Sequence, residues 1–149
     1  MNTQSELDGF IDRYSPQVAA DARRALAFLK LRLPTARRLV YDNYNALVVG
    51  FGTSDKVSDI ILSIALYPRW VTLFFLRGTV LPDPRGLLEG SGSTVRGVRL
   101  QPVSRLETPE VGALIDAAVA NASPLIATGD GPLIIKSISA KQRPRRPKS

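Results

Sequence analysis

VSDIILSIALYPRWVTLFFLRGTVLPDPRGLLEGSGSTVRGVRL, residues 57–100, is the stretch that decides the fold. It contains two runs rich in Ile, Leu, Val and aromatic residues, at 59–67 and 70–76, with a Pro-Arg pair between them. Runs of this length and composition favour buried strands over helices, and proline presets the backbone for a tight turn. The stretch therefore predicts a β-hairpin that turns at Tyr67–Trp70.

The two runs together approach the length of a membrane-spanning helix, but the proline and arginine between them would lie in the bilayer interior, where both are costly. A hairpin inside a protein core is the better interpretation. We expect its large side chains to be buried together with one residue of a covering helix. These expected core residues are Leu29, Ile61, Ile64, Trp70, Leu73 and Phe75.

Helices are predicted on both sides of this stretch. Ser15 followed by Pro16 is a typical helix start, and apolar residues recur at helical spacing until Pro34, which ends the helix. A short helix is expected before it, at 5–14, and another starts at Thr108-Pro109. These helices are expected to cover the sheet with their apolar faces.

The full pattern predicts one α+β domain, an antiparallel sheet with N-terminal and C-terminal helices packed on it. Strand 94–100 is expected at a sheet edge because it carries charged residues. Segment 133–138 fits either a last strand or an extended arm. The other strand candidates lie at 37–44 and 46–51.

The positive charge is concentrated at the C-terminus. The chain of 149 residues has a net charge of +7, and residues 136–149 hold six basic and no acidic residues. Residues 1–135 hold 14 basic against 13 acidic residues, so this part is nearly neutral. We therefore predict a folded domain at 1–138 and a basic disordered tail at 139–149.

Composition excludes several classes of chemistry. The chain has no cysteine and no histidine, which rules out disulfides, thiolate nucleophiles and a Ser-His-Asp triad. We expect no catalytic residue, no cofactor and no tight transition-metal site. The polar, acidic opening at 1–9 is unlike a secretory leader, so a soluble cytoplasmic protein with no membrane partner is expected.

Three segments carry a resemblance to a known family. They are YDNYN at 41–45, SDIILSIALYPRWVTLFFLRG at 58–78, and LPDPRGLLEGSGSTVRGVRL at 81–100. The chain resembles the YdhG-like domain family, a family of unknown function, over roughly residues 20–122. The resemblance implies a compact α+β domain related in architecture to frataxin-like folds. It also implies a link to intracellular iron delivery, which is known for some members.

Polar and aromatic residues interrupt the apolar strands in two places, at 41–45 and at 82–96. Loops held by a rigid sheet often carry binding groups, so we predict one shared ligand cleft. The alternatives are a polar strand end, a structural glycine turn, and an Arg77 that pairs with Asp83 or Glu89 at the surface. The predicted ligand-binding residues are Tyr41, Asn43, Tyr44, Arg77, Ser91 and Arg96.

The basic tail is a candidate for non-specific contact with nucleic-acid phosphates. No aromatic residue is interleaved with its charges, so the sequence does not predict base stacking. The alternative is a solubilising terminus. The predicted phosphate-contacting residues are Lys141, Arg143, Arg145, Arg146 and Lys148.

Three functions remain open at the level of the sequence. The first is a non-catalytic binding module for a small ligand or a protein partner. The second is nucleic-acid association through the tail. The third, an iron chaperone of frataxin-like type, needs clustered oxygen ligands. The acidic residues near the N-terminal helices are interrupted by arginines, as on an ordinary solvated face; they are Glu6, Asp8, Asp12 and Asp21.

Overall fold

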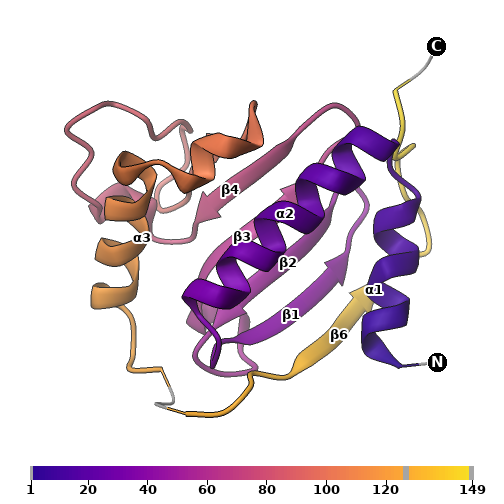
Figure 1. Cartoon of the computed structure of the whole chain (residues 1–149), viewed down its shortest axis with the longest axis horizontal. Helices are drawn as coiled ribbons and strands as arrows, with labels where there is room; N and C mark the ends of the chain where they lie inside the picture. Colours follow the sequence, from indigo (N-terminus) through magenta and orange to yellow (C-terminus); the bar gives the residue numbers. More distant parts are fainter. Residues whose placement is uncertain (1, 126–127, 148–149) are drawn as a thin grey trace.

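The computed structural model describes residues 2–125 and 128–147. In these residues six strands form one sheet, and helices lie on one face and at one end of it (Figure 1), which confirms the predicted α+β class. The helices are α1 (Thr3–Asp12), α2 (Pro16–Arg32) and α3 (Pro109–Asn121); the strands are β1 (Arg37–Asp42), β2 (Leu47–Gly52), β3 (Ile60–Leu66), β4 (Val71–Phe75), β5 (Arg96–Arg99) and β6 (Leu133–Ile138); and 3₁₀ turns η1, η2 and η3 occupy Val57–Asp59, Gly78–Val80 and Val103–Glu107.

The strands lie in the order β5-β4-β3-β2-β1-β6. All neighbouring pairs are antiparallel except β1 and β6, which are parallel. After β5 the chain passes through α3 to the opposite edge and enters β6 at the end where β1 begins. The sheet is therefore mixed, whereas the sequence predicts an antiparallel one. Segment 133–138 is a strand, and β5 is an edge strand as expected.

The predicted hairpin is confirmed. β3 and β4 pair from Leu62 opposite Phe75 to Leu66 opposite Val71. The turn between them is closed by Tyr67, whose backbone N–H donates to the carbonyl of Trp70 at 2.9 Å. Proline at the second turn position supplies the required backbone angle.

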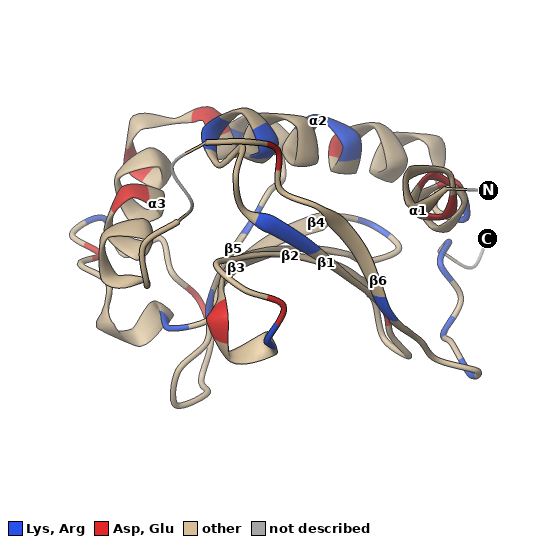
Figure 2. Ribbon diagram, turned by 90° about the horizontal axis from the view of Figure 1, so that it is seen from below, with Lys and Arg blue, Asp and Glu red and all other residues tan. Residues whose placement is uncertain are grey.

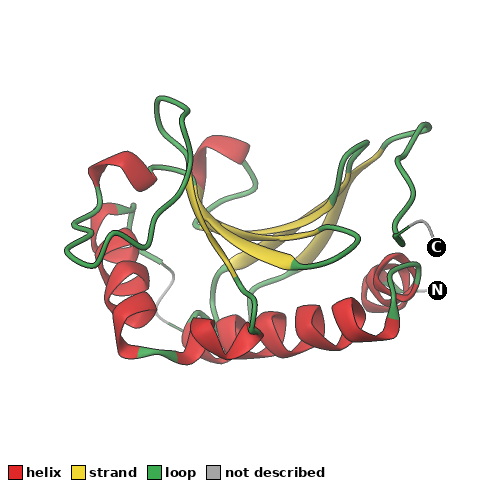
Figure 3. Cartoon of the chain, turned by 90° about the horizontal axis from the view of Figure 1, so that it is seen from above, coloured by secondary structure: helices red, strands yellow, loops and turns green. Residues whose placement is uncertain are grey.

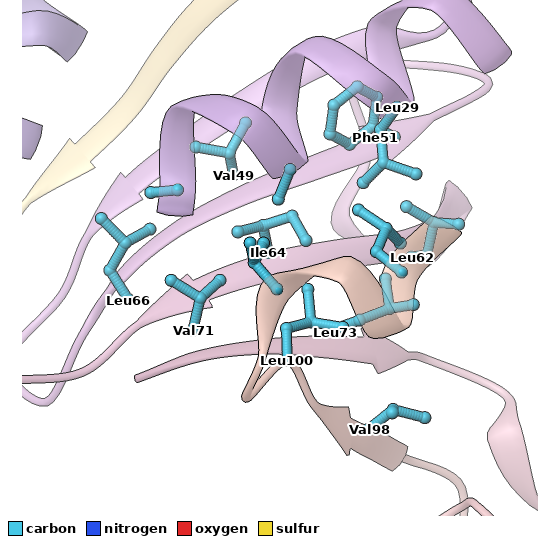
Figure 4. Close-up of a cluster of buried hydrophobic side chains, with 14 of the residues drawn as sticks. Leu29, Val49, Phe51, Leu62, Ile64, Leu66, Val71, Leu73, Val98 and Leu100 are labelled. Carbon is cyan, nitrogen blue, oxygen red and sulfur yellow. The ribbon is translucent and has the colours of Figure 1, made fainter. Parts of the chain in front are cut away.

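α2 covers one face of the sheet (Figure 3). Its start is capped by Ser15, whose Oγ accepts a hydrogen bond from the N–H of Val18, and Pro16 is its first residue, as predicted. Leu29 points from α2 into a cluster of side chains from β2 to β5 (Figure 4). The core side chains expected from the sequence are buried with one exception; those confirmed are Leu29, Ile61, Ile64, Leu73 and Phe75.

Trp70 is the exception, because it is only half-buried. Side chains alternate between the two faces of a strand, and Val71 next to it points into the core. Trp70 therefore lies on the face away from α2. The guanidinium carbon of Arg99 on β5 lies 3.7 Å from the centroid of its ring. The apolar run around Trp70 predicts that its side chain is buried in the core. In the structure the side chain of Arg99 covers the ring instead.

Candidate functional site

The C-terminal segment 139–147 is packed against the turn between β1 and β2, at one end of the sheet, and the prediction that it is disordered is wrong for these residues. Its backbone donates hydrogen bonds from Ser139 to the carbonyl of Asp42 and from Arg143 to the carbonyl of Tyr44, both at 2.9 Å. Residues 148–149, including the predicted phosphate contact Lys148, lie outside the described residues. A segment rich in charge and proline is predicted to be disordered on the assumption that all of its charged side chains are solvated. In this segment one charged side chain is buried instead.

That buried charge belongs to Arg145, which is 4% exposed. Its Nη2 donates to Oδ1 of Asp42 at 2.9 Å and to the carbonyl of Asn43 at 2.6 Å. Asp42, at the end of β1, is itself only 1% exposed. A buried charge is tolerated when it is paired and hydrogen-bonded. The pair therefore fixes the C-terminal segment on the turn between β1 and β2.

The ring of Tyr14 packs against the arginine of this pair. The guanidinium carbon of Arg145 lies 5.7 Å from its ring centroid, within the range of a cation–π contact. Its hydroxyl donates to the carbonyl of Leu66 at 2.9 Å and accepts from the N–H of Leu47 at 3.1 Å. Burial raises the pKa of the Tyr14 phenol above its usual range. Tyr14 thus joins the ends of β2 and β3 beneath the buried arginine.

The burial of Arg145 removes it from the predicted set of phosphate contacts. Lys141 and Arg143 are exposed, as that prediction requires. Arg146 is exposed too, although its guanidinium donates to the backbone carbonyls of Asp12 and Arg13 at the end of α1. One arginine of the segment therefore anchors it, and its neighbours remain at the surface.

The segment lies beside the two turns at one end of the sheet. Arg143 contacts the ring of Tyr44, with its guanidinium carbon 5.7 Å from the ring centroid. A shallow groove of about 520 Å³ runs between the segment and the turn that joins β3 to β4. It is lined by Asn45, Tyr67, Pro68, Arg69, Arg143, Pro144, Arg146 and Pro147.

We call residues 43–46, 67–70 and 139–147 together the turn-and-tail surface. These three segments contain five basic residues, three aromatic residues and no acidic residue. The basic residues of the C-terminal segment lie along the edge of the molecule next to α1 (Figure 2). The surface therefore combines guanidinium groups with aromatic rings, which are the two groups that bind phosphates and bases.

Sequence reasoning missed the contribution of the β3–β4 turn to this surface, namely Tyr67, Arg69 and Trp70. A signal for it was present. In a run of antiparallel strands, the turn after the first strand and the turn after the third lie at the same end of the sheet. The paired registers place Leu47 opposite Leu66, so the two turns are neighbours.

The predicted shared ligand cleft does not exist. Tyr41, Asn43 and Tyr44 lie at or next to the turn between β1 and β2. The other predicted residues, Arg77, Ser91 and Arg96, lie at the far end of the sheet, where β4 ends and β5 begins. Two segments that each end an apolar strand look alike in the sequence, but the direction of each strand decides which end of the sheet they reach.

The glycine loop at 86–92 is a structural turn, which is one of the alternatives to the predicted cleft. Arg96 folds back onto it and donates to the carbonyls of Gly92 at 2.6 Å and Val95 at 2.8 Å. The carboxylate of Asp83 accepts from the backbone N–H groups of Leu87 and Leu88, both at 2.9 Å. The loop is therefore organised by its own polar groups.

Arg77 contacts neither Asp83 nor Glu89; it donates to the carbonyl of Ser58 at 3.4 Å. It lines a pocket of about 70 Å³ whose walls include Ile61 and Phe75. A cavity of about 150 Å³ holds a molecule the size of benzene, so this pocket has room for a few waters rather than for a nucleotide. The turn-and-tail surface is the stronger candidate.

In residues 2–125 and 128–147, no three His, Cys, Asp or Glu side chains lie close enough together to hold a metal ion. Over the same part of the chain, no helix combines the length and the apolar character needed to cross a bilayer.

The fold and the surface define a single α+β domain whose C-terminal segment completes a basic, aromatic-bearing surface. No family model, curated protein or solved structure matches the chain. The resemblance to YdhG-like domains therefore stays a prediction.

Proposed function

We propose that this protein is a non-catalytic binding module and that its ligand is a nucleic acid held at the turn-and-tail surface. The observation that carries the proposal is the burial of Arg145, because it holds the C-terminal segment in place beside the β3–β4 turn. Arg143 and Arg69 then line one groove with Tyr67.

The chemistry of the groove suits phosphates. Guanidinium groups donate paired hydrogen bonds to phosphate oxygens, and each phosphate neutralised by Lys or Arg releases counterions from the nucleic acid. An ordered segment also loses less conformational entropy on binding than a disordered tail does. No acidic residue within the three segments opposes the approach of a polyanion.

The test is fluorescence anisotropy of a labelled oligonucleotide titrated with the full chain at several salt concentrations. The double variant Arg69→Gln/Arg143→Gln removes two exposed charges from the groove and leaves the buried pair intact. We expect it to weaken binding by roughly tenfold at about 50 mM salt and to reduce the salt slope by about two.

The matched control is Lys56→Gln/Arg85→Gln, which lowers the net charge equally. Both residues are exposed, and both belong to loops at the other end of the sheet. The control should bind as the wild type does. Equal weakening in the two double variants would overturn the proposal, because net charge rather than this surface would then govern binding.

A further inference from the structure

The sheet face opposite α2 carries a row of side chains close to the turn-and-tail surface. Register pairs place Val48, Ala65, Thr72 and Arg99 side by side across β2 to β5. Tyr41 on β1 continues the row. Their sequence neighbours point to α2 (Figure 4); examples are Val49, Ile64, Leu66, Val71 and Leu73. The row therefore lies on the face that α2 does not cover.

Two aromatic residues of the β3–β4 turn stand at the end of this row. Leu66 and Val71 point into the core, so Tyr67 and Trp70 next to them point to the uncovered face. Their ring centroids are 6.3 Å apart and their planes are tilted by 43°. Both rings are half-buried, and Arg99 lies over the ring of Trp70. An aromatic pair with an arginine is thus held at the surface.

Tyr67 connects this pair to the rest of the turn-and-tail surface. It lines the groove that contains Arg69 and Arg143, and it also lines a second hollow together with Tyr44 and Val48. Tyr44 is 48% exposed. Tyr67 therefore lines the basic groove itself, with Trp70 beside it and Tyr44 in the adjoining hollow.

We propose that this surface binds single-stranded nucleic acid in preference to duplex, with bases stacking on Tyr44 and Tyr67 beside the Trp70–Arg99 pair; this rests on the proposed function. A duplex presents phosphates but hides the faces of its bases, whereas a single strand presents both. Base stacking on aromatic side chains, with phosphates held by nearby arginines, is how single strands are bound without sequence preference. Contacts to phosphates alone would not involve the exposed ring of Tyr44 or the half-buried ring of Tyr67.

Trp70 is the only tryptophan, so its intrinsic fluorescence reports on the surface directly. The full chain is titrated with a thymidine strand of about 15 nucleotides, an abasic strand of the same length, and a duplex of that length. We expect the thymidine strand to quench the fluorescence with saturation. The abasic strand and the duplex should bind at least about tenfold more weakly and leave the emission nearly unchanged.

The variant Tyr44→Leu keeps every charge and removes one exposed ring. It should weaken binding of the thymidine strand by about tenfold and leave binding of the abasic strand unchanged. Its matched control is Phe28→Leu, which removes a partly buried ring from α2 on the other side of the sheet. The control should bind all three strands as the wild type does.

Equal binding of the abasic, duplex and thymidine strands, with no change in emission, would overturn this inference while the proposed function still stood. Failure of every strand to bind would overturn the proposed function itself. The stacking site would also be contradicted if Phe28→Leu weakened binding of the thymidine strand as much as Tyr44→Leu does. The reason is that the two rings lie on different faces of the sheet.

Discussion

Asp42 and Arg145 form a buried ion pair that is not fully satisfied by hydrogen bonds. Among the described residues, Oδ2 of Asp42 and Nε of Arg145 have no hydrogen-bond partner, although Nη1 of Arg13 lies 3.6 Å from that oxygen. Removing two charges from water costs several kcal/mol per ion, and their attraction offsets this only when the geometry is complete. We infer that the pair specifies where the C-terminal segment lies more than it stabilises the fold.

This inference predicts different outcomes for single and double substitution. Arg145→Met leaves a buried carboxylate without its partner and should lower the free energy of unfolding by about 3–5 kcal/mol. Asp42→Leu/Arg145→Met removes both charges and should recover most of that loss. Urea denaturation measures both values.

The control for this pair of variants is Arg143→Met, an exposed neighbour in the same segment. Its effect should stay within about 0.5 kcal/mol, as for most surface substitutions. A cost of less than about 1 kcal/mol for Arg145→Met would contradict the buried-pair interpretation.

The raised pKa of Tyr14 predicts a loss of stability at alkaline pH. Burial raises the pKa of its phenol above the ordinary value of 10.0, so the folded chain keeps the proton that the unfolded chain releases. The associated stability is present below pH 10 and declines as the pH rises through the raised pKa. Denaturation curves between about pH 8 and about pH 11 should show this decline.

The variant Tyr14→Phe should make the alkaline decline less steep. It should not abolish the decline, because burial also raises the pKa of Tyr41 and Tyr67. At neutral pH the variant loses the bonds to Leu66 and Leu47 and should be destabilised by about 1–3 kcal/mol. An unchanged alkaline slope would show that Tyr14 does not carry the effect.

At the scale of elements, β6 is the strand whose placement the sequence leaves most open. It is reached by a crossing that passes close to the start of β1, where the N–H of Gly131 donates to the carbonyl of Pro34 at 2.9 Å. A side chain on Gly131 would overlap the carbonyl oxygen of Ala36. Glycine is therefore required there for β6 to pair with β1 and to carry the C-terminal segment to its site.

Gly131→Ala should accordingly push β6 away from β1. We expect a loss of about 1–3 kcal/mol, the usual cost of forcing extra volume into a packed position. The matched control is Gly92→Ala, where an added methyl group meets nothing within 4 Å and the backbone is not in the left-handed region. Hydrogen exchange at 133–138 should accelerate in the first variant only; equal protection in both would contradict this account of Gly131.

At the scale of the whole molecule, the C-terminal segment is part of the fold as well as part of the proposed interface. Deleting residues 139–149 would remove Arg145 and uncover Asp42 together with Tyr14. A loss of nucleic-acid binding on deletion would therefore mix two effects, lost contacts and a damaged sheet end. Point substitutions at Arg69 and Arg143 separate them.

We predict that the deletion lowers the free energy of unfolding by about 3–5 kcal/mol, as expected when a buried carboxylate loses a buried partner. Adding Asp42→Leu to the deletion should restore part of this stability without restoring binding. Thermal denaturation and anisotropy on the same samples measure the two quantities. A deletion variant as stable as the full chain would mean that 139–147 contributes nothing to the fold.

The sequence by itself determined the features that depend on neighbouring residues. Ser15-Pro16 and Thr108-Pro109 start helices because capping is local, and the Tyr67–Trp70 turn follows from a proline between two apolar runs. The α+β class follows from the order of such elements. The absence of histidine and cysteine likewise excludes their chemistry without any knowledge of the fold.

Only the tertiary structure decided which residues meet. Asp42 and Arg145 are 103 positions apart, and nothing in either neighbourhood indicates that one neutralises the other. The same holds for the half-buried Trp70, whose partner Arg99 is on another strand, and for β6, whose direction depends on the end at which the chain reaches β1. Local propensity acts through bonds and near neighbours, whereas burial, charge pairing and strand order depend on the path of the whole chain.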